Sequence, residues 1–111
     1  MALLRRSYKS EQEAIQIGQT LVSFRNATVQ KNGAEISITP IEIKILKKLY
    51  DNKNYIVSTE SLCDTIWGVD SFGYENSLTV HIRKIREKIE ENPSKPQYLK
   101  TAKGLGYKLL S

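Results

Sequence analysis

One stretch of the chain, residues 76–91, combines the side-chain types that could read the edges of base pairs. Spaced as a helix, it places Asn76, Ser77, Val80, Arg83 and Lys84 on one face, together with Glu87 and Lys88 and flanked by Thr79 and Arg86. Lys and Arg bind phosphates and guanine, Asn binds adenine, and a small apolar group contacts the thymine methyl. For an isolated helix, an ordinary solvated face with Glu-to-Lys pairs would be the better interpretation.

The segment that follows this helix favours DNA binding over an ordinary solvated face. Asn92-Pro93 ends the helix, and residues 98–110 then form two expected strands around Gly104 and Gly106. Both glycines tolerate positive φ, so the turn leaves Lys103 at or near the tip of the hairpin. A cation at such a tip can reach a phosphate or enter a narrow minor groove. A basic helix followed by a basic hairpin therefore indicates a duplex DNA partner.

The charge distribution supports a polyanionic partner. The net charge is +5, yet residues 1–75 hold nine Lys/Arg against nine Asp/Glu, whereas residues 76–111 hold eight against three. A solvated surface usually mixes both signs, so this segregation favours nucleic acid ahead of an anionic membrane. We interpret Lys88, Lys95, Lys100 and Lys108 individually as generic surface charges that raise the local potential.

Catalytic and metal chemistry lack the residues that they need. The one His and the one Cys, His81 and Cys63, fall on different expected helices, and no glycine-rich phosphate loop or motif-set pair of carboxylates is present. We expect no enzyme activity, no metal site and no cofactor. A single Cys excludes an internal disulfide, and no apolar run approaches the roughly 20 residues that span a bilayer. A reducing, cytoplasmic setting follows, because the short apolar start also does not fit a secretory signal.

The first third of the chain has the pattern of a small antiparallel sheet. Short apolar alternations predict strands over residues 14–17, 21–24, 27–30 and 35–38. Between the last two, Asn32-Gly33 is a strong hairpin signal because both residues tolerate positive φ. The length of 111 residues leaves room for one such domain.

Three helices are expected to follow. Thr39, Pro40 and Glu42 form the N-terminal signal of the first, a capping box with Pro in the first turn. The second starts at Ser58 or Thr59 and stops at Gly68. The third, residues 76–91, buries the stripe of Leu78, Ile82, Ile85 and Ile89.

The segment 39–110 resembles the winged-helix output domain of the OmpR/PhoB family of two-component response regulators. Four motifs carry the resemblance in order: ITPIEIKIL at 38–46, TIWG at 65–68, LTVHIRKIREKI at 78–89 and TAKGLGY at 101–107. The resemblance implies an α+β winged helix with an N-terminal four-stranded antiparallel sheet, three helices and a C-terminal β-hairpin wing. It implies sequence-specific binding of double-stranded DNA, with the third helix in the major groove and the wing at the minor groove.

Family positions then suggest roles for individual residues. Contacts to bases or nearby backbone would come from Asn76, Ser77, Thr79, Val80, Arg83 and Lys84, phosphate contacts from His81 and Arg86, and wing contacts from Thr101 and Lys103. The loop that can meet RNA polymerase comprises Trp67, Gly68, Val69, Asp70, Ser71, Phe72, Gly73, Tyr74 and Glu75. For Trp67 we prefer packing in the core, and His81 has helix packing, with a hydrogen bond to backbone, as its alternative.

Three departures from the family pattern bear on specificity. Asn76 and Lys103 stand where the family often has Arg, and Thr79 stands where it often has Asp. The base preference of well-known members therefore does not transfer. Lys lacks the planar fork of Arg and is more strongly hydrated, so minor-groove insertion by Lys103 is less secure than a phosphate contact.

The resemblance also implies the wider protein. Residues 1–12 would be the remnant of a receiver helix and linker, and residues 13–111 the DNA-binding domain. A receiver domain upstream would carry the phosphorylated aspartate of the phosphorelay, and the isolated, monomeric domain would bind in tandem on direct-repeat operators. A winged helix used for protein contacts is the main alternative. RNA binding is a weaker one, because the chain lacks an aromatic platform for stacking bases.

Overall fold

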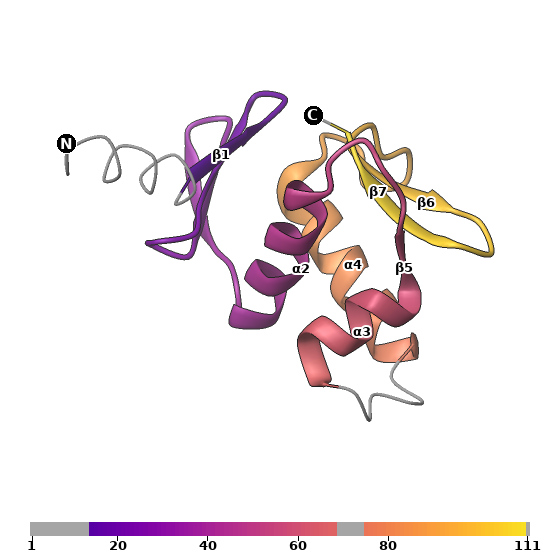
Figure 1. Cartoon of the computed structure of the whole chain (residues 1–111). Coiled ribbons are helices and arrows are strands. Elements are labelled where there is room, and N and C mark those ends of the chain that lie inside the picture. Colours follow the sequence, from indigo (N-terminus) through magenta and orange to yellow (C-terminus); the bar gives the residue numbers. More distant parts are fainter. Residues whose placement is uncertain (1–13, 69–74, 111) are drawn as a thin grey trace, which may run out of the picture.

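The computed structural model describes residues 14–68 and 75–110, which form two antiparallel sheets with three helices between them (Figure 1). The N-terminal sheet has the order β1-β2-β3-β4, with β1 Ala14–Ile17, β2 Thr20–Ser23, β3 Thr28–Lys31 and β4 Ala34–Ser37. The helices are α2 Pro40–Asp51, α3 Thr59–Trp67 and α4 Glu75–Ile89. The second sheet has the order β5-β7-β6, with β5 Val57–Ser58, β6 Leu99–Ala102 and β7 Gly106–Leu109.

The four predicted N-terminal strands are confirmed, with three of them displaced by one residue. Ala27 has a left-handed φ of 56°, so it belongs to the turn, and β3 starts at Thr28. At the start of β2, the turn at Gly18 (φ 60°) lets Thr20 pair with Ile17, so β2 begins one residue earlier than predicted. The predicted Asn32-Gly33 turn has φ values of 53° and 81°, as a tight hairpin requires.

The signals that start the first two helices, and the glycine that stops the second, are also confirmed. Thr39 Oγ1 accepts a hydrogen bond from Glu42 N (3.2 Å), and Glu42 Oε1 accepts one from Thr39 N (2.9 Å), which is the expected capping box. Ser58 caps α3 through Ser61 N (3.0 Å), and Gly68 ends that helix with φ 95°. These caps satisfy amide groups that the first helical turn leaves unpaired.

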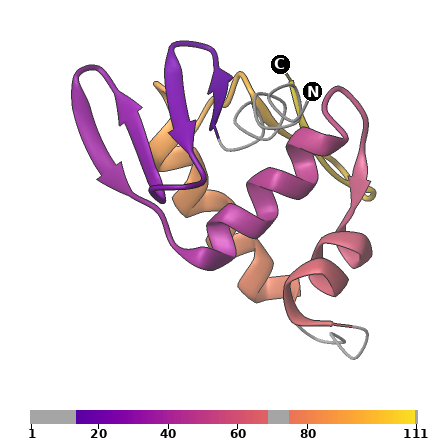
Figure 2. The same cartoon turned by 60° about the vertical axis from the view of Figure 1, so that its left-hand side comes forward.

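The third helix, α4, crosses behind α2 and carries the main apolar face of the core (Figure 2). Its predicted stripe is fully buried, with Leu78 at 0% exposure and Ile82, Ile85 and Ile89 at 1–2%. The helix ends at Ile89, two residues earlier than predicted. Both Glu90 and Glu91 therefore belong to the connection between α4 and the wing.

A short strand that the sequence analysis missed, β5, completes the wing sheet. Val57 pairs with Tyr107 and Ser58 with Gly106, so the residues just before α3 are bonded to the hairpin β6-β7. Gly106 permits this approach, because a Cβ atom there would overlap the backbone of Val57. None of the helices described, α2, α3 and α4, is both long and apolar enough to cross a membrane.

Candidate nucleic-acid interface

The surface of α4 opposite its buried stripe is what we name the open face. Its members are all exposed: Asn76, Ser77, Thr79, Val80, Arg83 and Lys84. Val80 leaves 51% of its surface accessible, although it is apolar. Within the described part of the chain, Arg83 and Lys84 have no hydrogen bond or ion pair, so both cations are available to a ligand. The predicted combination of cations, short polar groups and a small apolar group is thus present on one accessible helix face.

The wing presents its predicted cation beside an apolar residue. Lys103 is exposed in the turn between β6 and β7, next to Gly104 with φ 79°. Leu105 follows with 61% exposure, and its backbone is fixed, since Leu105 N donates to Ala102 O (2.8 Å) and Leu105 O accepts from Thr59 N (3.3 Å). The sequence analysis did not single out Leu105, although an apolar residue between two turn glycines was a usable signal of exposure.

Arg86 lies between α4 and the wing and bonds to both backbone and side chain there. Its Nε donates to Leu99 O (3.0 Å), and its Nη2 donates to Thr101 Oγ1 (2.8 Å). Burial lowers the pKa of Arg86, while the neighbouring Tyr107 and Glu90 act in the opposite direction. An Arg side chain nevertheless keeps its charge at physiological pH. Arg86 and Thr101, predicted as separate DNA contacts, are therefore bonded to one another.

A groove of about 590 Å³ runs between α4 and the wing. Thr79, Arg83, Arg86 and Thr101 contribute to its lining, so four of the predicted site residues from two elements face one hollow. The Arg86–Thr101 bond links the helix side of this groove to the wing side.

His81, in the middle of α4, packs against Trp67, the last residue of α3. The two ring centroids are 6.2 Å apart with an interplanar angle of 43°. His81 is half-buried, and its Nδ1 is buried without a hydrogen-bond partner in the described residues. Trp67 packs against the core, as we preferred from the sequence. Of the other loop residues predicted to meet a polymerase, Gly68 ends α3 and Glu75 begins α4, whereas Val69 to Tyr74 lie outside the described residues.

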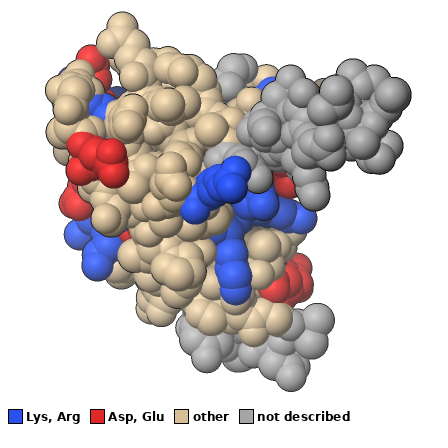
Figure 3. Space-filling model, turned by 90° about the vertical axis from the view of Figure 1, so that its left-hand side faces the viewer, with Lys and Arg blue, Asp and Glu red and all other residues tan. Residues whose placement is uncertain are grey.

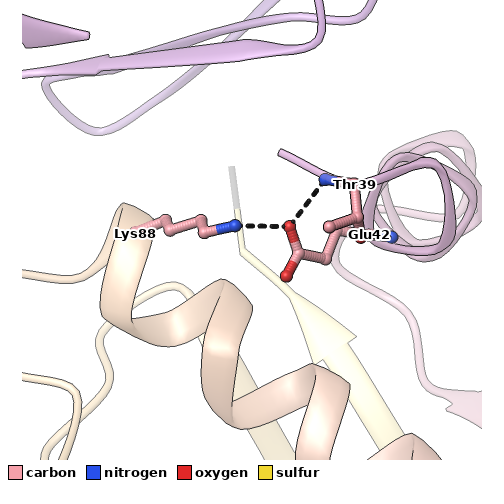
Figure 4. Close-up of polar contacts among 3 residues, drawn as sticks. All are labelled: Thr39, Glu42 and Lys88. Atoms are coloured by element: carbon pink, nitrogen blue, oxygen red, sulfur yellow. Dashed lines mark hydrogen bonds and ion pairs between the residues drawn. The ribbon is translucent and has the colours of Figure 1, made fainter. Parts of the chain in front are cut away.

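The interpretation of Lys88 as a generic surface charge was wrong. Lys88 Nζ lies 2.7 Å from Glu42 Oε1, and the same oxygen accepts the Thr39 amide (Figure 4). The Glu42 side chain is only 1% exposed and that of Lys88 is 21% exposed. The capping-box carboxylate points into the interior, where it needs a cation, and Lys88 beside the buried Ile89 supplies one.

The C-terminal end of α4 is held by the N-terminal sheet. Lys31 Nζ donates to the carbonyls of Glu87 (3.2 Å) and Glu90 (3.0 Å), and Thr20 Oγ1 donates to Ile89 O (3.3 Å). The last carbonyls of a helix have no partner within it, so these side chains satisfy groups that would otherwise need water. Sequence reasoning missed this role of β2 and β3, because the contacts span 56 to 69 residues of the chain.

Charge beside the N-terminal sheet is mixed. Figure 3 shows the side that carries the N-terminal sheet, where Lys and Arg as well as Asp and Glu appear among wide uncharged areas.

Among residues 14–68 and 75–110, no group of three or more His, Cys, Asp or Glu could hold a metal ion. Cys63 is 2% exposed and packs within the core.

The matching family and two similar proteins are all described as transcriptional regulatory proteins. The family described as "Transcriptional regulatory protein, C terminal" matches residues 33–109. The chain is 37% identical to the uncharacterized transcriptional regulatory protein YcbL of Bacillus subtilis, over 97% of this chain and 50% of that protein. It is 38% identical to the alkaline phosphatase synthesis transcriptional regulatory protein SphR of Synechococcus elongatus, over 97% of this chain and 43% of that protein. The chain thus spans about half the length of these relatives.

Solved structures agree with the fold. The response regulator DrrB, a Thermotoga maritima OmpR/PhoB homolog, superimposes with a TM-score of 0.79 at 27% identity, over 98% of this chain and 49% of that one. The DNA-binding domain of Bacillus subtilis CssR gives a TM-score of 0.70 at 26% identity, over 83% of this chain and 100% of that one.

Proposed function

The chain belongs to the transcriptional regulatory protein C-terminal family, the output domain of OmpR/PhoB-type response regulators, and from this premise we propose that it binds double-stranded DNA sequence-specifically. In this proposal α4 enters the major groove and the wing lies at the adjacent minor groove. The observation that carries it is the open face of α4, whose Arg83 and Lys84 are exposed and unbonded within the described residues, on a helix whose other side is buried.

The roles of individual residues follow from their chemistry and position. Arg83 or Lys84 would bond guanine edges, Asn76 would bond adenine, and Val80 would contact a thymine methyl. Ser77, Thr79, His81, Arg86 and Thr101 would contact phosphates or sugars and so set the register, and Lys103 would bind a phosphate at the minor groove. Arg86 is already oriented by its bonds to the wing, which favours a fixed phosphate contact.

Selection from a random pool of DNA duplexes at moderate salt tests binding and base readout together. We expect enrichment of a short motif, because the open face offers side chains that distinguish base pairs. Retention without enrichment would leave only phosphate binding, whose affinity falls steeply with salt. No retention would favour the alternative, a winged helix used for protein contacts, which predicts little salt dependence.

The intact regulator is a further part of the proposal. The curated relatives are about twice as long as this chain, so we propose a receiver domain upstream whose phosphorylation controls pairing of two output domains on a direct repeat. The loop between α3 and α4 would meet RNA polymerase, and the setting would be the cytoplasm. Enrichment of a direct repeat in the same selection would support tandem binding, whereas an inverted repeat would contradict it.

A further inference from the structure

A single buried carboxylate joins the end of α4 to the first residues of the wing. We propose that Glu90 is a positioning residue that holds the wing at the distance and angle from α4 at which both contact one duplex. The inference rests on the proposed DNA-binding function. It adds a residue that would touch no DNA.

The geometry of Glu90 is that of a backbone clamp. Oε1 accepts a hydrogen bond from Gln97 N (2.7 Å), and Oε2 accepts bonds from Tyr98 N (3.0 Å) and Leu99 N (2.7 Å). Glu90 is 1% exposed; its bond from Leu99 N is buried, and those from Gln97 N and Tyr98 N are partly buried. Charge-assisted bonds of this kind are stronger and shorter than neutral ones. The three amides belong to the end of the connection and the first residue of β6.

Arg86 completes the clamp from one helical turn earlier. Leu99 N donates to Glu90, while Leu99 O accepts from Arg86 Nε (3.0 Å). Both backbone groups of the first β6 residue are therefore bound to side chains of two residues four positions apart. A residue held at both its donor and its acceptor cannot rotate about the helix without breaking one of these bonds.

The connection itself offers little else to fix the wing. In residues 91–96 the described backbone and side-chain bonds are local, Lys95 N to Asn92 O (2.9 Å) and Ser94 N to Asn92 Oδ1 (3.1 Å). These bonds shape the turn around Asn92 without reaching β6. The clamp, rather than the length of the connection, thus sets where the hairpin begins.

The position of Glu90 is in turn fixed by the N-terminal sheet. Lys31 on β3 donates to the Glu90 carbonyl, and the Tyr98 ring lies so close to Gly18 that a Cβ atom there would overlap it. An anion at the C-terminal end of a helix is placed against the helix dipole, and burial adds to the cost. The three amide bonds offset that cost.

The test compares Glu90→Gln with Glu91→Gln, each with and without Lys103→Ala, on the duplex enriched by selection or otherwise on a mixed-sequence duplex. Gln has the size of Glu but one oxygen, so it cannot accept all three amides. Exposed Glu91 undergoes the same charge change. We expect Lys103→Ala to make the salt slope shallower by about one unit in wild type and in the Glu91 variant. In the Glu90 variant it should change the slope less, because the start of β6 is no longer fixed to the end of α4, although β5 still pairs with β7. An equal effect of Lys103→Ala in both variants would overturn the proposal.

A second variant tests the clamp without touching a buried charge, in case Glu90→Gln does not fold. One glycine inserted after Lys95 lengthens the connection but leaves the clamp intact. We expect the Lys103→Ala effect to persist in this variant. Its loss would mean that the connection positions the wing, and the proposal would fail.

The Glu90 clamp can still be tested if the protein binds no duplex and the proposed function fails. Amide hydrogen exchange in the DNA-free protein then reports the clamp directly. We expect the Leu99 amide to exchange at least about 100-fold more slowly than an unstructured amide, as a stably bonded buried group does. Unprotected Gln97, Tyr98 and Leu99 amides would overturn the clamp independently of any DNA.

Discussion

The middle and the C-terminal end of α4 use the same kinds of charged side chain in opposite ways. Toward its middle, Arg83 and Lys84 extend into solvent without a bond in the described residues. One turn later, Arg86 binds the wing and Lys88 binds Glu42. The cations of this basic helix therefore divide into those without a bond in the described residues and those bonded within the fold, and the division cannot be predicted from charge alone.

The glycines of the wing repeat this contrast. A Cβ atom added to Gly104 in the turn would meet no other atom, whereas one added to Gly106 would overlap the backbone of Val57. At the tip of the hairpin only the positive φ of Gly104 limits the side chain, while the base of the hairpin is constrained by β5. Both comparisons indicate that the C-terminal end of α4 and the base of the wing maintain the fold. The open face and the wing tip are left accessible to a partner.

The largest change in stability that distinguishes the C-terminal end of α4 from its middle is expected from Lys88→Met. Removal of the cation leaves the Glu42 carboxylate buried with only its capping bond, and we expect a loss of about 3 kcal/mol in the free energy of unfolding. Lys84→Met is the matched control and should change stability by less than about 0.5 kcal/mol. Urea unfolding followed by circular dichroism measures both. Equal stability changes would remove the distinction between the two lysines.

Within the wing, Gly106→Ala should destabilise more than Gly104→Ala. The new methyl group at position 106 would meet backbone atoms of Val57 and Ser58, and we expect a cost of about 2 to 3 kcal/mol. At position 104 only the positive φ of 79° is strained, at about 1 kcal/mol. Thermal unfolding of the two variants provides the measurement. A larger cost at position 104 would contradict the assignment of the base of the wing to the fold.

Local features of the fold were predictable because nearby residues determine them. The capping box at Thr39, the Asn32-Gly33 turn and the buried stripe of α4 each depend on a few consecutive residues or on helical spacing. Strand ends were displaced by one residue where Ala27 adopts a left-handed conformation, for which Ala gives no signal.

Features that depend on distant partners were not predictable. The strand β5 has two residues and exists because Tyr107 and Gly106 pair with it. Lys88, Glu90 and Lys31 look like surface charges in the sequence, and their bonds link segments brought together only by the tertiary fold. For the candidate site, the exposed residues of the open face followed from periodicity, whereas the Arg86–Thr101 bond did not.

On the open face, Arg83→Ala tests base readout. If Arg83 makes a bidentate contact to guanine, the variant should lose about 1 to 3 kcal/mol on the selected duplex and lose preference at particular base pairs. Arg83→Lys is the informative control, because it keeps the charge but lacks the planar fork. Binding titrations on single-substitution duplexes compare the three proteins. Parallel energy profiles for wild type and Arg83→Ala would remove Arg83 from the base-reading residues.

The smallest effect concerns the wing tip, where Lys103→Ala should weaken all duplexes similarly. A phosphate contact releases bound counterions, so its loss should reduce the slope of log affinity against log salt by about one unit. Lys95→Ala removes the same charge from the exposed connection, away from the tip, and should leave the slope nearly unchanged. Titrations at several salt concentrations measure the difference. A selective loss at one base pair would mean that Lys103 reads the minor groove, and equal slopes for the two variants would mean that the wing tip contributes only diffuse charge.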